Sequence, residues 1–480
     1  MTVVIDGESL TLESVHAVAV DSDKVELSVE ARARIAAARE VVLELLERGD
    51  PVYGLTTGLA ERKKVELTGE WRRKFSEWAV RSHRVAQVPF ASAPVVRATM
   101  LCLVNTYAKG AAGVRPELAD SIVGALNAGF VPQVRTLGSV GQADLGPMAD
   151  LAVSLLDRGE LELAENEGLA LLNNNAFSTG SAALAVIEAE QLLASADVAA
   201  ALDLEAFGAN LSPLHRIVAE LRPFPGAGAT IDRLHVILDG SSAWEAGWAR
   251  NLQDPLTFRC IPQIHGAARD ALAYARRVAE TEVNSAQGNP AISVEERRAI
   301  SVGNFDVVAL AAALDFARIS LAPVLTSASE RTVKLLQAPV SGLPAGLAAS
   351  PHTGEDALAE FGVASQALTA EARTLAHPVS FEVVSSMKAE GIEDRMTMAP
   401  LSARRLAETV SIGSRVLAIE LTVACQAIEL RPLEQLGAGT AEALRVVRRH
   451  VPAVRAGELP PHDLEPLVES IALGEIARCR

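Results

Sequence analysis

Four ionisable side chains lie in polar or glycine-rich segments, where substrates are commonly bound: Tyr53, His83, Arg259 and Glu393. A planar guanidinium such as that of Arg259 suits bidentate binding of a carboxylate. A tyrosine acts as a base where nearby positive charge and helix N-termini lower its pKa, and a glutamate accepts hydrogen bonds from a cation or moves a proton. Each residue alone has an ordinary structural explanation, so the hypothesis of an active site depends on the set.

Two further stretches could complete such a site. "GLALLNNNAFSTG" ends an apolar run in Asn173, Asn174 and Asn175, a residue type that also caps helices and closes turns. "GSVGQADLGPM" at 138–148 has the form of a glycine-rich loop that leads into a helix. Whether this loop forms a reactive group from its own backbone decides which chemistry is available.

The segments between these loops have helical periodicity and helix-forming composition. Helices are predicted over 29–48, 181–204, 266–283, 305–335, 355–376 and 402–429. Short β-like pieces, "TVVIDG" and "KVELS", lie near the N-terminus. The sequence therefore predicts a mainly α protein, with a smaller mixed N-terminal head over 1–205 and a helical bundle over 206–480.

The composition argues against several classes of function. Hydrophobic residues make up 49% of the 480 and aromatic residues only 4%, which suits closely packed helices rich in Ala, Leu and Val. A net charge of −16 without a polybasic run argues against nucleic acid as a partner. Acidic residues near the N-terminus, charges within the longest apolar windows and four widely spaced cysteines predict a cytoplasmic protein with no membrane span and no metal site.

Several strings, taken together and in order, resemble the histidine and aromatic amino acid ammonia-lyase family nearly from end to end. They are "VYGLTTGLA", "RSHRVA", "GLALLNNN", "QDPLTFRCIPQIHGA", "SVGNF", "SERTVKLL" and "LAHPVSFEVVSS…IEDRMTMAP". The resemblance implies a fumarase/aspartase-like fold of long helices, assembled as a homotetramer with active sites shared between subunits. It also implies a small-molecule substrate that carries a carboxylate.

The resemblance implies a role for each matching residue. Tyr53 matches the base that removes a proton from the β-carbon, and Arg259 matches the residue that holds the carboxylate. Asn173 and Glu393 match residues that line the site near the electrophile and near the amino group or ring. His83 and Phe305 match pocket positions.

The loop departs from the family at its defining element. In the family an Ala-Ser-Gly triplet cyclises and loses water, which gives an electrophilic methylidene-imidazolone group (MIO). Here "QAD" (Gln142 to Asp144) replaces the triplet and the following Asp, one residue shorter and without the serine or the glycine. Ser139 does not substitute, because the attacking nitrogen would belong to the β-branched Val140. We therefore expect that the MIO cofactor is not formed and that the chain needs none, as in ergothionase.

Other departures fall around the same position. Leu256 stands where the family has a tyrosine, and Asn174 stands where a glycine gives clearance. We expect both to line a reshaped pocket together with Gln142, while Lys388 assists Glu393 with the substrate ring or with proton return. Asp144 could either cap a helix or contact the substrate.

Three hypotheses remain open on the sequence alone. The first is a lyase without the electrophile, which eliminates an amine from an amino acid or from an amino-acid-derived betaine. The second is an isomerisation, a cyclisation or an addition in the same pocket. The third is a non-catalytic tetrameric relative.

Overall fold

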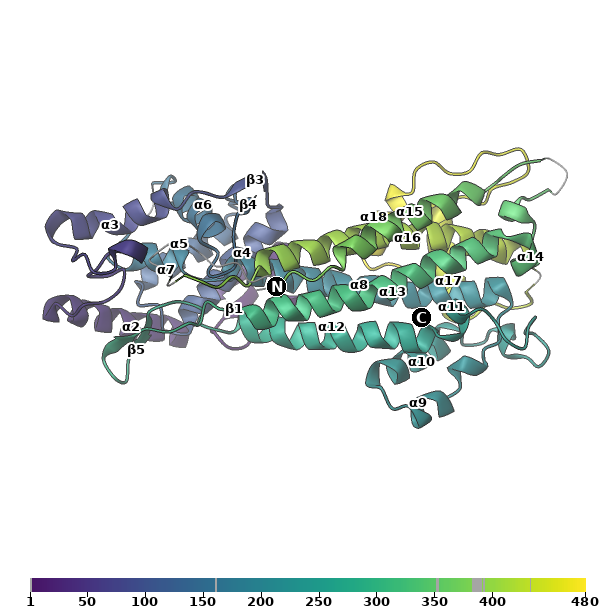
Figure 1. Cartoon of the computed structure of the whole chain (residues 1–480), viewed down its shortest axis with the longest axis horizontal. Helices are drawn as coiled ribbons and strands as arrows, with labels where there is room; N and C mark the ends of the chain where they lie inside the picture. Colours follow the sequence, from purple (N-terminus) through teal and green to yellow (C-terminus); the bar gives the residue numbers. More distant parts are fainter. Residues whose placement is uncertain (1, 160–161, 351–353, 382–390, 392, 432) are drawn as a thin grey trace. The chain divides into compact units, whose positions relative to one another are not determined.

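The computed structural model describes residues 2–159, 162–350, 354–381, 391, 393–431 and 433–480 (Figure 1). Its longer helices are α2 (Val29–Arg48), α3 (Gly69–Ser82), α4 (Ala93–Ala108), α5 (Pro116–Asn127), α6 (Leu145–Leu156), α8 (Ala176–Phe207), α10 (Pro225–Ile237), α12 (Ile261–Val283), α13 (Val308–Leu336), α15 (Ala359–Leu375), α16 (Ala399–Leu430) and α17 (Ala438–His450). The shorter helices are α1 (Leu12–Ala19), α7 (Glu167–Leu172), α9 (Ile217–Leu221), α11 (Leu256–Arg259), α14 (Ala338–Ser341) and α18 (Glu465–Ala472). A mainly α fold is confirmed.

The described strands form three two-stranded sheets. Strands β1 (Thr2–Ile5) and β2 (Lys24–Leu27) pair in parallel, and they correspond to the two predicted β-like pieces. Strands β3 (Gln87–Phe90) and β4 (Arg135–Leu137) pair antiparallel, as do β5 (Ala291–Ser293) and β6 (Arg298–Ile300). Each sheet is short, and Ile5, Val25 and Ile292 of these strands are buried in the core.

The chain divides by its contacts into two compact units, each made of several segments. Unit 1 contains Met1–Ile187, Ala275–Leu314 and Pro378–Arg404, and unit 2 contains Glu188–Tyr274, Asp315–His377 and Arg405–Arg480. The chain passes repeatedly from one unit to the other. Boundaries fall inside α8, α12, α13 and α16, and another lies between His377 and Pro378. The division of the linear chain at residue 205 stays a prediction.

Unit 2 is a bundle of long helices that approach closely. Gly413 of α16 faces Leu192 of α8 and Leu325 of α13, and an added Cβ would lie 2.8 Å from the Leu192 side chain. His265 of α12 bonds through Nδ1 to Asp197 of α8 at 2.8 Å. Small residues on these helices permit the close packing, as the Ala-rich composition predicts.

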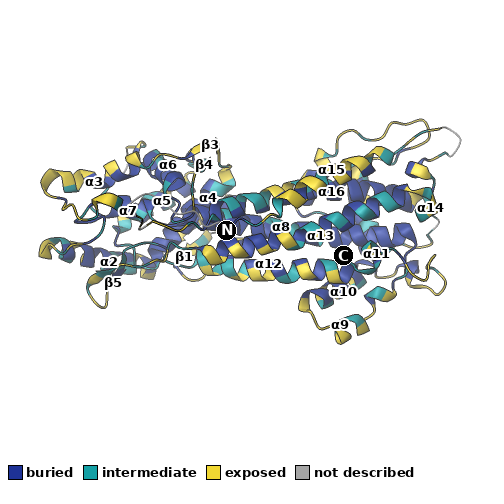
Figure 2. Cartoon of the chain, viewed as in Figure 1, coloured by how far each residue is buried: buried dark blue, intermediate teal, exposed yellow. Residues whose placement is uncertain are grey.

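Unit 1 contains helices that the sequence patterns did not reveal. In α4, each side chain from Val96 to Ala108 is buried, so polar and apolar residues do not alternate with a helical period (Figure 2). Helix α7 lies against α3 at Gly168, where a Cβ would meet the Ser76 carbonyl oxygen at 2.3 Å. The predicted mixed head is therefore largely helical.

Two helices, α13 and α16, are long and apolar enough to cross a membrane by length and composition alone. The single charged residues in these apolar windows therefore do not by themselves exclude a membrane span. Most of each apolar window is buried within the fold, as in the core helices of globular proteins, which pass the same test.

Candidate active site

The glycine-rich loop is tied to the segment that precedes α16. Gly141 has φ +77°, and a Cβ there would meet Thr397 Oγ1 at 2.3 Å, so both the backbone conformation and the space require glycine. The Gly141 carbonyl accepts hydrogen bonds from Thr397 Oγ1 at 2.8 Å and from Asn175 Nδ2 at 3.1 Å. The Val140 carbonyl accepts from the Thr397 N–H at 3.1 Å. These bonds hold the loop in one conformation.

Gln142 presents a hydrogen-bond acceptor in this loop. Its Nε2 donates to Asp306 Oδ2 at 2.9 Å, and Arg395 Nε donates to the same oxygen at 3.1 Å. An ionised carboxylate only accepts hydrogen bonds, so the Gln142 carboxamide must turn its Nε2 toward Asp306. Its Oε1 is buried without a hydrogen-bond partner among the described residues, and so is Oδ1 of the neighbouring Asn175.

The backbone nitrogen of Asp144 is already engaged. It donates to the Asn174 carbonyl oxygen at 2.8 Å. Ring closure of the family type would need a nitrogen to attack the carbonyl carbon two residues earlier, which here is that of Gln142. Between them Ala143 adopts φ +58°, a left-handed conformation that costs free energy for a residue with a Cβ.

The Asp144 carboxylate caps a helix, although not the helix that it begins. Asp144 is fully buried and precedes α6, whose first turn it does not cap with its side chain. Its oxygens instead accept from Ser178 N at 2.7 Å and Ser178 Oγ at 2.8 Å, in the first turn of α8. Ser139 Oγ donates to it at 3.3 Å. Burial raises the pKa of Asp144 to about 6, while the bonds from both serines act in the opposite direction.

Tyr53 lies half-buried in the loop that follows α2, where its hydroxyl accepts from the Ala60 N–H at 3.0 Å. Burial raises the pKa of Tyr53 above its usual value, the negative charge of Glu393 raises it further, and Lys63 lowers it. The pKa shift is therefore opposite to the lowering that a tyrosine base requires. The Glu393 carboxylate is therefore one of the charges that act on the Tyr53 hydroxyl.

His83 ends α3 and is held by its own helix. Its Nδ1 bonds to the Ala79 carbonyl at 2.8 Å and lies 3.3 Å from Ser82 Oγ. A carbonyl only accepts, so Nδ1 carries the hydrogen and neutral His83 keeps Nε2 as an acceptor. Phe305 is half-buried directly before Asp306, the partner of Gln142.

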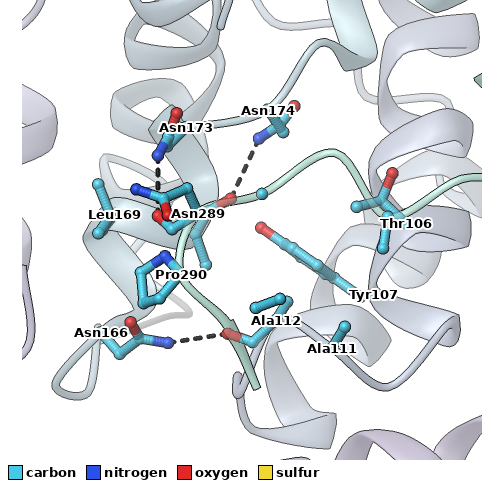
Figure 3. A pocket seen from close by; sticks show the side chains of 14 residues that line it. Thr106, Tyr107, Ala111, Ala112, Asn166, Leu169, Asn173, Asn174, Asn289 and Pro290 are labelled. Atoms are coloured by element: carbon cyan, nitrogen blue, oxygen red, sulfur yellow. Dashed lines mark hydrogen bonds between the residues drawn. The ribbon is translucent and has the colours of Figure 1, made fainter. Parts of the chain in front are cut away.

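The first two asparagines of the run make different hydrogen bonds. Asn173 Nδ2 donates to the Asn289 carbonyl at 2.8 Å, and the side chain borders a small cavity (Figure 3). Asn174 Nδ2 donates to the Ala170 carbonyl at 3.1 Å and its Oδ1 accepts from the Ala176 N–H at 3.0 Å. Asn174 therefore joins the end of α7 to the start of α8, and its contact with substrate stays a prediction.

Arg259 and Leu256 lie in unit 2, whereas the other described candidates lie in unit 1. Both belong to α11, which Phe258 anchors by stacking on Phe207 at a centroid distance of 4.3 Å. Arg259 Nη1 donates to Gln253 Oε1, and its Nε is buried without a hydrogen-bond partner in the described part of the chain. Leu256 is 63% exposed.

Sequence reasoning missed Gln253 and Thr397 as supports of the site, and it named Asn175 only as part of the asparagine run. Gln253, Asn175 and Thr397 support predicted site residues, and the signal for Gln253 was its position six residues before Arg259 in "QDPLTFR". Lys388 lies outside the described residues. Among the residues that are described, no group of three His, Cys, Asp or Glu side chains could hold a metal ion.

The mainly helical fold carries a glycine-rich loop that leads into α6 and bonds to α8 and to the segment before α16. The chain belongs to the aromatic amino acid lyase family, which it matches over residues 10–449. Carbon–nitrogen lyases of amino acids are therefore its relatives.

Individual relatives cover almost the whole chain. Histidine ammonia-lyase from Streptococcus sanguinis is 34% identical over 93% of this chain and 91% of its own length. Histidine ammonia-lyase from Treponema denticola is 33% identical over 98% and 97%. Among solved structures, ergothionase from Treponema denticola, in complex with desmethyl-ergothioneine sulfonic acid, superposes with a TM-score of 0.93 at 25% identity over the full length of both chains. Tyrosine aminomutase from Streptomyces globisporus gives 0.93 at 28% identity, over 100% of this chain and 98% of its own.

Proposed function

We propose that this chain is a carbon–nitrogen lyase that works without a backbone-derived electrophile. The observation that carries the proposal is the bond from the Asp144 N–H to the Asn174 carbonyl. The residues present do not fit the family's MIO group. The loop has no Ser-Gly pair to dehydrate, Asp144 brings a side chain where glycine eases ring closure, and its nitrogen already donates to the Asn174 carbonyl.

Without an electrophile, the substrate itself must make elimination easier. Tyr53 removes the β-proton, the C–N bond breaks, the electron pair of the C–H bond becomes the C=C bond, and the amine leaves with the electrons of the C–N bond. A quaternary ammonium leaves as a neutral tertiary amine and needs no added proton. Its permanent positive charge also opposes the effects of burial and of Glu393 on the pKa of Tyr53.

The remaining residues bind and orient the substrate in this proposal. Arg259, held at Nη1 by Gln253, binds the carboxylate, and Asn173 borders the site beside the loop. His83 presents Nε2 as a proton acceptor, and Glu393 returns the proton from Tyr53 to solvent because its side chain is exposed. Assembly as a homotetramer with active sites shared between subunits is part of this proposal.

The test is a product assay on matched substrates. The purified chain is incubated with L-histidine, L-tyrosine, L-phenylalanine and the Nα-trimethyl betaine of each, and free amine and acrylate product are measured by mass spectrometry. We expect an acrylate and trimethylamine from at least one betaine, with slower release of ammonia from the parent amino acid. A chain that releases ammonia from a parent amino acid faster than amine from its betaine would contradict the proposal.

A second reaction is favoured by one observation, the likeness to tyrosine aminomutase. An aminomutase moves the amino group within one molecule, so its product keeps the mass of the substrate. The same assay detects it as a new chromatographic peak of unchanged mass. Such a peak in the absence of acrylate would assign the chain to this second reaction.

A further inference from the structure

A small cavity lies in unit 1, and Asn173 and Asn174 form part of its wall. It has a volume of about 30 Å³, and it lies between the C-terminal end of α4, the helix α7 and the segment that leads into β5 (Figure 3). Its polar lining includes Thr106, Tyr107, Asn166, Asn173 and Asn289. A cavity needs about 10–15 Å³ of this kind of volume for each water molecule, so there is room for about two.

Tyr107 is the residue that makes this cavity more than a packing defect. Its side chain is 1% exposed, and its ring points into the cavity from α4 (Figure 3). The hydroxyl has no hydrogen-bond partner among the residues that the structure describes. A buried hydroxyl without a partner loses its hydration and gains nothing in return, so tyrosine hydroxyls in protein interiors are normally bonded.

The neighbouring polar groups are already largely engaged, so they do not supply that partner directly. Asn166 Nδ2 donates to the Ala112 carbonyl at 2.8 Å, and Asn173 Nδ2 donates to the Asn289 carbonyl at 2.8 Å. The Asn173 carboxamide has a second N–H and an oxygen besides this bond. Burial and the negative charge of Glu167 raise the pKa of Tyr107 well above its usual value, so it remains a hydroxyl that can donate.

We propose that this cavity is a binding site for two water molecules that link the Tyr107 hydroxyl to the Asn173 carboxamide. Tyr107 is then a positioning residue, because the waters bound to its hydroxyl fix the side chain of Asn173. The cavity excludes larger ligands by its size, and its neutral lining favours water over an ion. The effect on catalysis rests on the proposed function, in which Asn173 borders the substrate.

The water site is tested by crystallography, independently of any activity. Crystal structures of the full chain and of Tyr107→Phe, at a resolution that shows ordered water, are compared. We expect two waters in the cavity of the unaltered chain, one of them within hydrogen-bond distance of Tyr107 Oη, and the loss of that one in Tyr107→Phe. A dry cavity, or a direct bond from Tyr107 Oη to a protein group, would overturn the proposal.

The positioning role is tested by kinetics on whichever substrate the chain turns over. We expect Tyr107→Phe to lower kcat/KM by about 2- to 10-fold, which is the effect of losing one hydrogen bond. The double variant Tyr107→Phe/Asn173→Ala should be no slower than Asn173→Ala alone, because both changes break the same link. Unchanged kinetics or additive effects would overturn the positioning role. Tyr274→Phe, in unit 2, is the matched control and should leave kcat/KM unchanged.

Failure of this proposal is distinguishable from failure of the proposed function. If no substrate is found, the crystal structures still decide whether the cavity holds water. If turnover is found but the cavity is dry, the lyase proposal stands and the role of Tyr107 falls.

Discussion

The Asp144 N–H donates a hydrogen bond to the Asn174 carbonyl oxygen at 2.8 Å. The same residue sends its buried carboxylate to the first turn of α8, where Ser178 donates twice. Asp144 therefore fastens the loop to the start of α8 through both its backbone and its side chain. This arrangement supports the proposal that the loop does not close the ring of the MIO group.

The first prediction concerns the loop itself. We expect the intact mass of the purified chain to equal the mass of its sequence, because the proposed function requires no backbone dehydration. We also expect borohydride to leave turnover unchanged, since the loop holds no electrophilic alkene for hydride to reduce. A mass lower by one or more water molecules would contradict both the geometry and the proposed reaction.

The second prediction concerns Tyr53 as the base. Tyr53→Phe should reduce turnover by at least about 100-fold, in line with the contribution of a positioned base. Because the pKa of Tyr53 is raised, only a small fraction is ionised near pH 8, and kcat/KM should rise about tenfold per pH unit through the alkaline range. The measurement is a pH–rate profile of the unaltered chain and of the variant. A flat profile, with an active Tyr53→Phe protein, would remove Tyr53 from this role.

The third prediction concerns the charge that Glu393 places near Tyr53. Glu393→Gln removes a negative charge, so the pKa of Tyr53 should fall toward its usual value. The chain has three tyrosines, so Tyr107→Phe and Tyr274→Phe together leave only Tyr53. In that background the ultraviolet absorbance of tyrosinate measures the pKa of Tyr53. Asp463→Asn, a change in unit 2, is the control and should leave the titration unchanged. A rise in the pKa of Tyr53 in Glu393→Gln would show that the two groups do not interact as described.

The fourth prediction concerns Asp144 and pH. Its pKa of about 6 in the folded chain lies above the unfolded value of 3.8, so the folded state binds more protons between these two values. The contribution of Asp144 to stability is therefore fully present below about pH 3.8 and is lost, by about 3 kcal/mol in all, as pH rises through about 6.

Asp144→Asn should remove this dependence, since an amide does not titrate. The difference in thermal midpoint between Asp144→Asn and the unaltered chain is measured from pH 4 to pH 7. We expect it to shift in favour of the variant as pH rises. A difference that stays constant, or that shifts the other way, would mean that Asp144 is ionised throughout.

The fifth prediction concerns the proposed carboxylate ligand. Arg259→Lys keeps the charge but loses the planar pair of donors, so we expect KM to rise about 10- to 100-fold. Gln253→Ala should raise KM in the same direction by a smaller factor, because Arg259 loses the partner at its Nη1. The control is Arg415→Lys. Arg415 lies in α16 and forms an exposed ion pair with Glu465 of α18, so this change should have no effect on KM. Equal KM values in all three variants would exclude Arg259 from carboxylate binding.

Helical periodicity and helix-forming composition predicted the long helices best, including α8, in which no residue is exposed, whereas the shorter helices α3, α5 and α17 were not predicted. The periodicity over 29–48 predicted α2 with its observed bounds, and the four longest helices were found within a few residues of their ends. Helix α4 was missed because it combines a shorter length with burial of each residue from Val96 to Ala108, so no polar face marks its period. The strings that carry the family resemblance are local, so they could be read without a fold.

The sequence by itself determined the family, the mainly helical class and the absence of a Ser-Gly pair in the loop, because these depend on residue identity and short-range periodicity. Only the tertiary structure decided that Asp144 caps α8 rather than its own α6, and that the pKa of Tyr53 is raised rather than lowered. It alone showed that the buried Tyr107 hydroxyl lies at a small cavity that Asn173 also lines. Each of these outcomes depends on partners distant in sequence and on the loss of solvent around a group, and neither is encoded in its neighbours along the chain.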